Sequence, residues 1–382
     1  MSDDGPAPTG ADAGDRDADA AAGGNGGDND RDDHDDLVYH VAGDLVPANE
    51  ASVSVTDRGF QYGDAAFETV RAYGGTLWRW DAHVERLFDS LDALGMPADE
   101  MGLSALDLEA RVRDTLRAND LADAYVRLSV TRGEAAGFAP PAADRTDPTV
   151  VVLVKPLPRG GSPDAGGESV WDGPATLQTV KTRRVSDRAI PSEAKTHNYL
   201  NNVLARVETR VTGADEAVML DDDGRVAECA TANLFFVADD AIRTPSLDGP
   251  VLPGVTRAEV LDIAREEGFP IEEGAYTPDD VRGADEAFIA SSIREIRPVG
   301  TYDGVDIGGV SESVDSEARV TSSLGGPVTT LLSRLYDERV EAECYGDDPE
   351  DDPGVDGADI GGHGGGDIDG DSGGGDADHA PE

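Results

Sequence analysis

The sequence predicts an α/β protein made of two domains. Short runs of alternating apolar residues, typical of strands, are interspersed with stretches in which apolar residues recur at helical spacing. Residues 156–168 are rich in Pro, Gly and Ser without periodicity, which is typical of an exposed linker. The roughly 300 residues left between two acidic tails are enough for two apolar cores. We therefore expect a smaller N-terminal domain at residues 37–155 and a larger C-terminal domain at residues 169–345.

The two ends of the chain differ in composition from its interior. Residues 1–36 and 346–382 consist mainly of Asp, Gly and Ala, and they contain few side chains that a core could bury. Such segments cannot offset the conformational entropy that is lost on ordering. We expect both to be disordered acidic tails.

The first domain is expected to contain an antiparallel sheet and two helices. Alternating runs predict strands at residues 37–42, 52–55, 67–73, 125–131 and 149–154. An amphipathic helix is predicted from Trp80 to Leu94 because Val84, Leu87 and Leu91 recur at helical spacing, with Asp81 in the first turn. A second helix is predicted over residues 105–118.

The second domain is expected to mix strands and helices. Apolar runs predict strands near residues 175–180, 216–220, 234–237 and 287–290. Helices are predicted among them, near residues 199–209 and 257–266. The sequence contains no internal repeat.

The charge of the chain excludes several classes of partner. The sequence contains 31 Lys and Arg against 79 Asp and Glu, for a formal net charge of −48. Such a polyanion repels nucleic acids and acidic membranes. Because molar salt shrinks the Debye length to about 3 Å, the self-repulsion would be screened in concentrated salt. We therefore expect a halophilic protein.

Neither a metal site nor a disulfide framework is expected. The two cysteines, Cys229 and Cys344, have no metal-ligand spacing to the histidines. The chain shows no signal-peptide pattern and no apolar stretch of membrane-spanning length. These features favour a soluble protein in a reducing cytoplasm.

The lysine inventory points to covalent chemistry. Only Lys155, Lys181 and Lys195 occur, which leaves 31 − 3 = 28 arginines. Arginine can replace lysine where only a charge is needed, but it cannot form a Schiff base, so a covalent amine site must remain Lys. The inventory alone does not decide among the three, and a solvated loop lysine is the ordinary alternative for each.

Lys195 stands where a polar stretch runs into an amphipathic helix. The segment reads Lys195-Thr-His-Asn-Tyr-Leu-Asn-Asn-Val-Leu-Ala205. It resembles the cofactor-lysine segment of the class IV aminotransferases, in a haloarchaeal-type version. Further segments resemble the same family in the same order, at residues 57–73, 83–87, 123–133, 215–236, 252–257 and 290–299. The resemblance therefore covers nearly the whole interior of the chain.

The resemblance implies fold type IV, in which two α/β domains hold pyridoxal 5′-phosphate in the cleft between them. It makes Lys195 the lysine that forms the Schiff base and afterwards moves a proton between the substrate α-carbon and cofactor C4′. Burial in the cleft should lower the pKa of its amine. Glu228 matches the acid that binds the pyridine nitrogen and keeps the ring protonated. Without the family, Glu228 reads as a surface charge.

Other matching residues are expected to bind the remaining cofactor atoms. Arg86 matches the phosphate arginine, Ser292 matches a hydroxyl donor, and Tyr199 matches the tyrosine that hydrogen-bonds the phenolic oxygen. Val255 and Thr256 follow a glycine at a helix start, where backbone N–H groups and the helix dipole favour an anion. Alone, each of these residues has an ordinary structural interpretation.

The resemblance also implies a substrate pocket and a homodimer. Tyr62, Phe67, Tyr125 and Arg127 match residues that line the pocket of branched-chain enzymes, with Tyr125 and Arg127 holding the substrate carboxylate. In this family, the partner subunit contributes to the active site.

Two chemistries share all these cofactor contacts. One is transamination between an amino acid, branched-chain or similarly apolar, and 2-oxoglutarate; the segments around Tyr125 and Tyr199 favour it. The other is elimination of pyruvate from 4-amino-4-deoxychorismate to give 4-aminobenzoate for folate synthesis; Phe67-Glu-Thr-Val and Glu228-Cys229 favour it. A non-enzymatic acidic scaffold is a third hypothesis, but the retention of Lys195, Glu228 and Arg86 argues against it.

Overall fold

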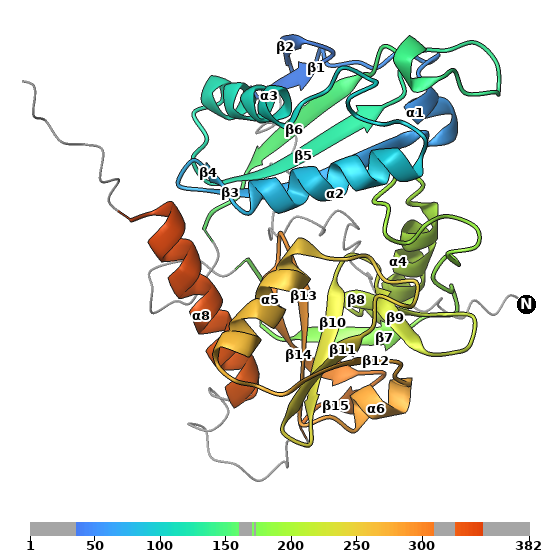
Figure 1. Ribbon diagram of the computed structural model, residues 1–382. Helices are drawn as coiled ribbons and strands as arrows, with labels where there is room; N and C mark the ends of the chain where they lie inside the picture. Colours follow the sequence, from blue (N-terminus) through green and yellow to red (C-terminus); the bar gives the residue numbers. More distant parts are fainter. Residues whose placement is uncertain (1–35, 160–169, 172, 309–324, 347–382) are drawn as a thin grey trace, which may run out of the picture. The chain divides into compact units, whose positions relative to one another are not determined.

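The computed structural model describes residues 36–159, 170–171, 173–308 and 325–346 (Figure 1). The predicted tails, apart from Asp36 and Gly346, lie outside these residues, as do residues 160–168 of the predicted linker. The described residues belong to one unit of contacts that ends at Gly346. The division into domains at residues 37–155 and 169–345 therefore stays a prediction.

The N-terminal part is built on a six-stranded sheet. Every pairing in it is antiparallel, and the strand order is β2-β1-β6-β5-β3-β4. The strands are β1 (Val38–Val41), β2 (Asp44–Pro47), β3 (Ala65–Tyr73), β4 (Thr76–Leu77), β5 (Ala124–Thr131) and β6 (Val150–Pro156). The helices are α1 (Arg58–Tyr62), α2 (Trp80–Ala93) and α3 (Ala105–Ala118), with a 3-10 turn, η1, at Ala143–Arg145.

Two amphipathic helices bury their apolar faces against this sheet. Val84, Leu87 and Leu91 of α2 share one core with Val70 of β3, while Leu108 of α3 belongs to the same core. The helix α3 begins where the Ser104 side chain accepts a hydrogen bond from the Asp107 backbone, as an N-cap should. The packing of α2 against β3 matters most for function, because both elements reach the site.

The C-terminal part is built on a nine-stranded mixed sheet. Its order is β12-β11-β10-β13-β14-β7-β8-β9, and β15 pairs with β14. The strands are β7 (Ala175–Thr179), β8 (Glu216–Leu220), β9 (Val226–Cys229), β10 (Asn233–Ala238), β11 (Ala241–Pro245), β12 (Ile271–Gly274), β13 (Glu286–Ser291), β14 (Glu295–Tyr302) and β15 (Val305–Asp306). Three pairings are parallel: β11 with β12, β7 with β14, and β7 with β8.

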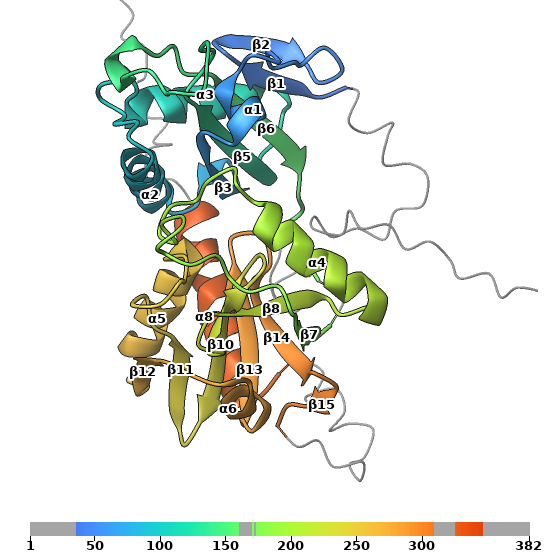
Figure 2. The ribbon, with the colours of Figure 1, turned by 90° about the vertical axis from the view of Figure 1, so that its right-hand side faces the viewer.

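Four described helices accompany the second sheet. They are α4 (Leu200–Thr212), α5 (Val255–Glu266), α6 (Pro278–Arg282) and α8 (Pro327–Cys344). The helices α5 and α8 contact each other and the β13–β14 hairpin, whereas α4 contacts β8 (Figure 2). Lys195 lies on the connection that leads into α4. In the part of the chain that the structure describes, no helix is long and apolar enough to cross a membrane.

Most elements with a strong periodicity are confirmed, including the helix at residues 105–118 and the strand at residues 216–220. The strand predicted at residues 52–55 is wrong, because this segment forms no ladder. The Ser54 hydroxyl accepts from the Thr56 backbone N–H, and the Ser54 carbonyl accepts from the Asp57 N–H. Such local bonds compete with strand pairing. The helix α8 was not predicted.

Candidate active site

Two adjoining pockets bring together most of the residues selected from the sequence. The first, which we call the arginine pocket, contains four basic side chains, and no acidic side chain of the described residues lines it; the basic residues are Arg86, Arg127, Lys195 and Arg294. The second, the glutamate pocket, contains Glu228 and Arg184. Lys195 and Tyr199 line both pockets, so they stand at the junction.

Lys195 is held through its main chain. Its carbonyl accepts from the Phe67 N–H at 2.9 Å, and a β-bridge joins Ala66 to Thr196. The lysine segment therefore pairs with β3 although about 130 residues separate them. The amine lies 4.6 Å from the centre of the Phe67 ring. Removal from water, with a further contribution from the positive charge of Arg86, lowers the pKa of this amine to about 8.

Arg86 is oriented by a buried carboxylate. Its Nε and Nη2 donate to Glu68 at 2.8 and 2.6 Å, and its Nη1 donates to the Pro253 carbonyl at 2.8 Å. Although burial alone would raise the pKa of Glu68, Arg86 and His83 lower it to about 2. Three of the five guanidinium N–H donors are thus engaged, and two are left for an anion in the pocket.

The Pro253 carbonyl leads directly into a helix start. Gly254 is the N-cap of α5, and no side chain caps this helix. A Cβ on Gly254 would lie 2.0 Å from the Asn233 Oδ1, so only glycine fits this close approach. Val255 and Thr256 supply the first backbone N–H groups of α5, which are the ordinary binding site for a phosphate. Ser292, from the β13–β14 turn, lines the same pocket.

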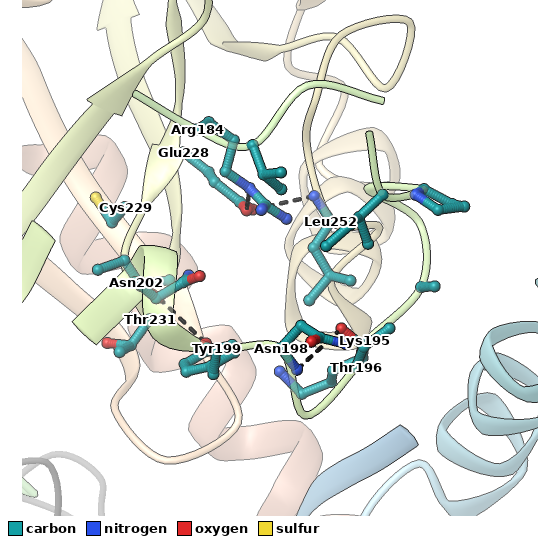
Figure 3. Close-up of a pocket in the computed structure, with 16 residues that line it drawn as sticks. Arg184, Lys195, Thr196, Asn198, Tyr199, Asn202, Glu228, Cys229, Thr231 and Leu252 are labelled. Carbon is teal, nitrogen blue, oxygen red and sulfur yellow. Dashed lines mark hydrogen bonds and ion pairs between the residues drawn. The ribbon is translucent and has the colours of Figure 1, made fainter. Parts of the chain in front are cut away.

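Glu228 is buried on β9 and is bound on both oxygens. Arg184 Nε donates to one oxygen at 2.6 Å, and the Leu252 N–H donates to the other at 3.0 Å (Figure 3). Only 7% of its side chain is exposed. The arginine partner explains how an acid that reads as a surface charge can be buried here.

Tyr199 is anchored at the junction of the pockets. Its hydroxyl donates to the Ala230 carbonyl at 3.1 Å, and Asn202 Nδ2 donates to the same carbonyl at 2.7 Å. Burial raises the pKa of Tyr199, so the phenol stays protonated. Its proton could turn to a ligand oxygen without leaving Ala230 unpaired, because Asn202 would remain.

Phe67, Tyr125 and Arg127 line the arginine pocket, as the sequence predicts for a substrate site. The Arg127 guanidinium lies 3.7 Å from the centre of the Phe67 ring. Among the described residues, no ion pair is formed by Arg127. A cation that is stacked on an aromatic ring and lacks a carboxylate partner is well placed to bind an anionic substrate.

Tyr62 is the one predicted site residue that lines neither pocket of the single chain. It is 41% exposed, and its ring packs edge-on against Phe138 at 5.6 Å. The adjacent Gly63 carbonyl accepts from Asn198 Nδ2 at 3.0 Å, so the Tyr62 loop borders the lysine segment.

Sequence reasoning missed several residues that shape the site, namely Glu68, Ser90, Arg184 and Arg294. Each is a polar residue in an apolar or unremarkable context, and its role depends on a partner far along the chain. Ser90, for example, accepts from the Lys195 N–H, which is 105 residues away. For Glu68, the spacing of His83 and Arg86 on one helix face was a usable signal, because these two residues share its carboxylate.

The arrangement fits pyridoxal phosphate, the cofactor that the resemblance implies. The arginine pocket offers a guanidinium and a helix N-terminus for a dianion. Lys195 offers an amine of lowered pKa for an aldehyde, and Glu228 offers a buried carboxylate that can accept from a ring N–H. We find no donor required by the family roles that the described residues lack. No group of three or more potential metal ligands occurs among the described residues.

Comparison with known proteins supports the same family. The family model for amino-transferase class IV matches residues 65–302. A Methanocaldococcus jannaschii protein, provisionally named a branched-chain-amino-acid aminotransferase, is 36% identical over 266 residues, which cover 69% of this chain and 88% of that protein. The branched-chain-amino-acid aminotransferase of Escherichia coli strain K12 is 32% identical over 300 residues, which cover 77% and 90%.

Solved structures agree with these relatives. The branched-chain amino acid aminotransferase of T.th., with pyridoxamine 5′-phosphate, superimposes with a TM-score of 0.69 at 30% identity, over 80% of this chain and 94% of that one. The same enzyme with N-(5′-phosphopyridoxyl)-L-glutamate gives a TM-score of 0.66 at the same identity and coverage. The predicted fold type IV architecture is thereby confirmed.

Proposed function

Because the chain belongs to the class IV aminotransferase family, we propose that it is a pyridoxal-phosphate enzyme that transfers an amino group between an apolar amino acid and 2-oxoglutarate. The observation that carries the proposal is the arginine pocket, which gathers positive charge around Lys195 in a chain of net charge −48. Cofactor and both substrates are anions, so such a pocket suits all three.

The bound cofactor would supply an aldehyde for a Schiff base with Lys195 and a ring that accepts electrons from the substrate α-carbon. Arg86, Val255, Thr256 and Ser292 would hold the phosphate. Glu228 would keep its negative charge against the ring nitrogen, because Arg184 and the Leu252 N–H bind the ionised carboxylate. Tyr199 would donate to the phenolic oxygen.

Lys195 would act twice. As a neutral amine it forms the covalent link, and once released by the substrate it carries the proton between the substrate α-carbon and C4′. Its lowered pKa suits both tasks, because a proton carrier works best near the ambient pH. Arg127, with Tyr125, would bind a substrate carboxylate, and Phe67 would contact the apolar side chain.

The branched-chain preference is supported by the relatives, which carry that name over most of their length. Lyase chemistry on 4-amino-4-deoxychorismate uses the same cofactor contacts and is the competing outcome. The deciding assay supplies leucine with 2-oxoglutarate in one reaction and 4-amino-4-deoxychorismate in another, both in molar KCl. Glutamate formation alone supports the proposal, whereas release of pyruvate and 4-aminobenzoate would overturn it in favour of the lyase.

A homodimer is the second part of the proposal, and the helix α4 supports it. Five of its apolar residues lie on one face and are 47–90% exposed: Leu200, Val203, Leu204, Val207 and Val211. Exposed apolar stripes of this kind are typical of protein interfaces. The helix also carries two arginines and one glutamate, so it lacks the acidity that would keep two copies apart elsewhere.

This helix face adjoins the site, because α4 starts directly after Tyr199 (Figures 1 and 2). The neighbouring loop exposes Phe60 and Tyr62, and we propose that a second copy buries both the stripe and this loop. Leu204→Glu should then convert the dimer into monomers in sedimentation experiments in molar KCl. Leu106→Glu is the matched control, since Leu106 is a 79% exposed residue of α3. A wild-type monomer would contradict this part of the proposal.

The acidic composition supports a salt-rich cytoplasm as the place where the enzyme works. Maximal activity in molar KCl and loss of structure in dilute buffer are the expected results.

A further inference from the structure

The hydroxyl of Ser90 connects the two segments that would hold opposite ends of the cofactor. Ser90 lies on α2 and has no solvent exposure. Its Oγ donates to the Arg86 carbonyl at 2.7 Å and accepts from the Lys195 backbone N–H at 2.9 Å. We propose that Ser90 is a positioning residue that sets where Lys195 stands relative to the phosphate site. This inference rests on the proposed function.

Ser90 completes the fixation of the lysine peptide. The Lys195 carbonyl is already taken by the Phe67 N–H of β3. With Ser90 on its N–H, both polar groups of the Lys195 main chain are bound to the N-terminal part of the protein. The origin of the lysine side chain is thereby fixed, and its amine can sweep only the volume that the side chain reaches from that point.

The same helix holds the phosphate end. Arg86 precedes Ser90 by one helical turn, and its Nη1 donates to the carbonyl of Pro253, next to the start of α5. The helix α2 therefore contacts the lysine segment through Ser90 and the phosphate cradle through Arg86. The phosphate and the aldehyde carbon are attached to one rigid ring, so covalent capture requires both contacts in register.

A purely structural role for Ser90 makes a different prediction. A buried hydroxyl that bonds the carbonyl four residues earlier is a common local feature of helices. Thr115 on α3 provides a matched example, since it is equally buried and its Oγ1 donates to the Arg111 carbonyl at 2.7 Å. Thr115 has no bond to the lysine segment. Thr115→Val therefore removes the local bond without the connection to Lys195.

The experiment compares two forms of the cofactor. Pyridoxal phosphate and pyridoxamine phosphate share ring and phosphate, but only the aldehyde form bonds to Lys195. Dissociation constants of both are measured by absorbance and fluorescence titration in molar KCl, for wild type, Ser90→Ala and Thr115→Val. Ser90→Ala leaves the Lys195 N–H without its partner and should weaken pyridoxal phosphate binding about tenfold. It should leave pyridoxamine phosphate binding within about twofold, and Thr115→Val should leave both within about twofold.

An equal loss for both forms, or no loss for either, overturns the positioning role. If Ser90→Ala does not fold, Ser90→Cys keeps a weaker hydrogen-bonding group, and the same ratio of constants should change in the same direction. Borohydride reduction and peptide mapping of the wild type separate this inference from the proposed function. Absence of a label on Lys195 defeats the proposed function, whereas a labelled Lys195 with an unchanged ratio in the variant defeats only the role of Ser90.

Discussion

The pKa of the Lys195 amine can be tested through the pH dependence of cofactor capture. Burial, helped by the charge of Arg86, lowers this pKa from 10.5 to about 8. At pH 7, about one amine in ten is then neutral, against roughly one in three thousand at an ordinary lysine. Because only the neutral amine attacks an aldehyde, Lys195 should react with pyridoxal phosphate about 300-fold faster at pH 7 than an unperturbed amine in the same place.

Stopped-flow absorbance of the cofactor-free protein measures this rate between pH 6 and pH 10. The rate constant should rise about tenfold per pH unit up to about pH 8 and then level off. Binding of pyridoxamine phosphate over the same range is the control, since it titrates the same phosphate and ring without the covalent step. A rate that keeps rising to pH 10 would show instead that the amine is solvated and its pKa ordinary.

The same pKa has a consequence for stability. Below pH 8 both folded and unfolded chains hold the proton, and burying the charged amine costs up to about 3 kcal/mol, an upper bound because the amine reaches an open pocket. Between pH 8 and pH 10.5 only the unfolded chain holds the proton, so stability rises with pH and the cost disappears above that window. Lys195→Met should therefore raise the denaturation midpoint at pH 7, and a gain that does not shrink above pH 8 would contradict this account.

Three further predictions concern single side chains. Borohydride should fix the cofactor in Lys155→Ala and Lys181→Ala but not in Lys195→Ala, as read by mass spectrometry; a fixed cofactor in the last variant would reassign the lysine. Glu228→Gln keeps the shape but removes the charge, so kcat should fall about 100-fold with cofactor affinity nearly unchanged; unchanged kcat would exclude the role. Glu68→Gln should lower the free energy of unfolding at pH 7 by about 3 kcal/mol. Because the pKa of Glu68 is about 2 in the folded chain, the difference from wild type should fade as pH drops from about 4.5 to 2, and a constant difference would contradict it.

Local periodicity was sufficient for elements whose faces are clearly divided. The helix at residues 105–118 has both an N-cap serine and an apolar stripe, and its predicted bounds match the structure. The segment at residues 52–55 alternates just as clearly but has no neighbouring strand to pair with, and its serine satisfies the backbone locally. Alternation predicts a strand only when a partner exists, and the partner lies elsewhere in the sequence.

The site could be selected from the sequence only through the family resemblance, and its residue roles remain proposals. Composition reduced the lysine question to three candidates, but nothing local distinguishes Lys195 from Lys155. What distinguishes it is pairing with β3 and the bond to Ser90, which are contacts across more than 100 residues. Glu228 was similarly ambiguous, because burial of an acid depends on its counter-ion, and Arg184 precedes it by 44 residues.

The charge distribution gives the salt dependence a definite sign. Arg86 and Arg294 are each paired with a buried acid, Glu68 and Glu216 respectively, so Arg127 carries the uncompensated charge of the pocket together with Lys195. In dilute buffer, an anionic substrate is repelled by a chain of net charge −48 before it reaches Arg127. In molar salt the Debye length of about 3 Å confines that repulsion to contact distance, whereas the direct bond to Arg127 persists. The KM for 2-oxoglutarate should therefore fall as KCl rises from 0.1 to 1 M, measured where circular dichroism shows the protein folded throughout. A KM that rises with salt would mean that the local field of the pocket outweighs the charge of the whole chain.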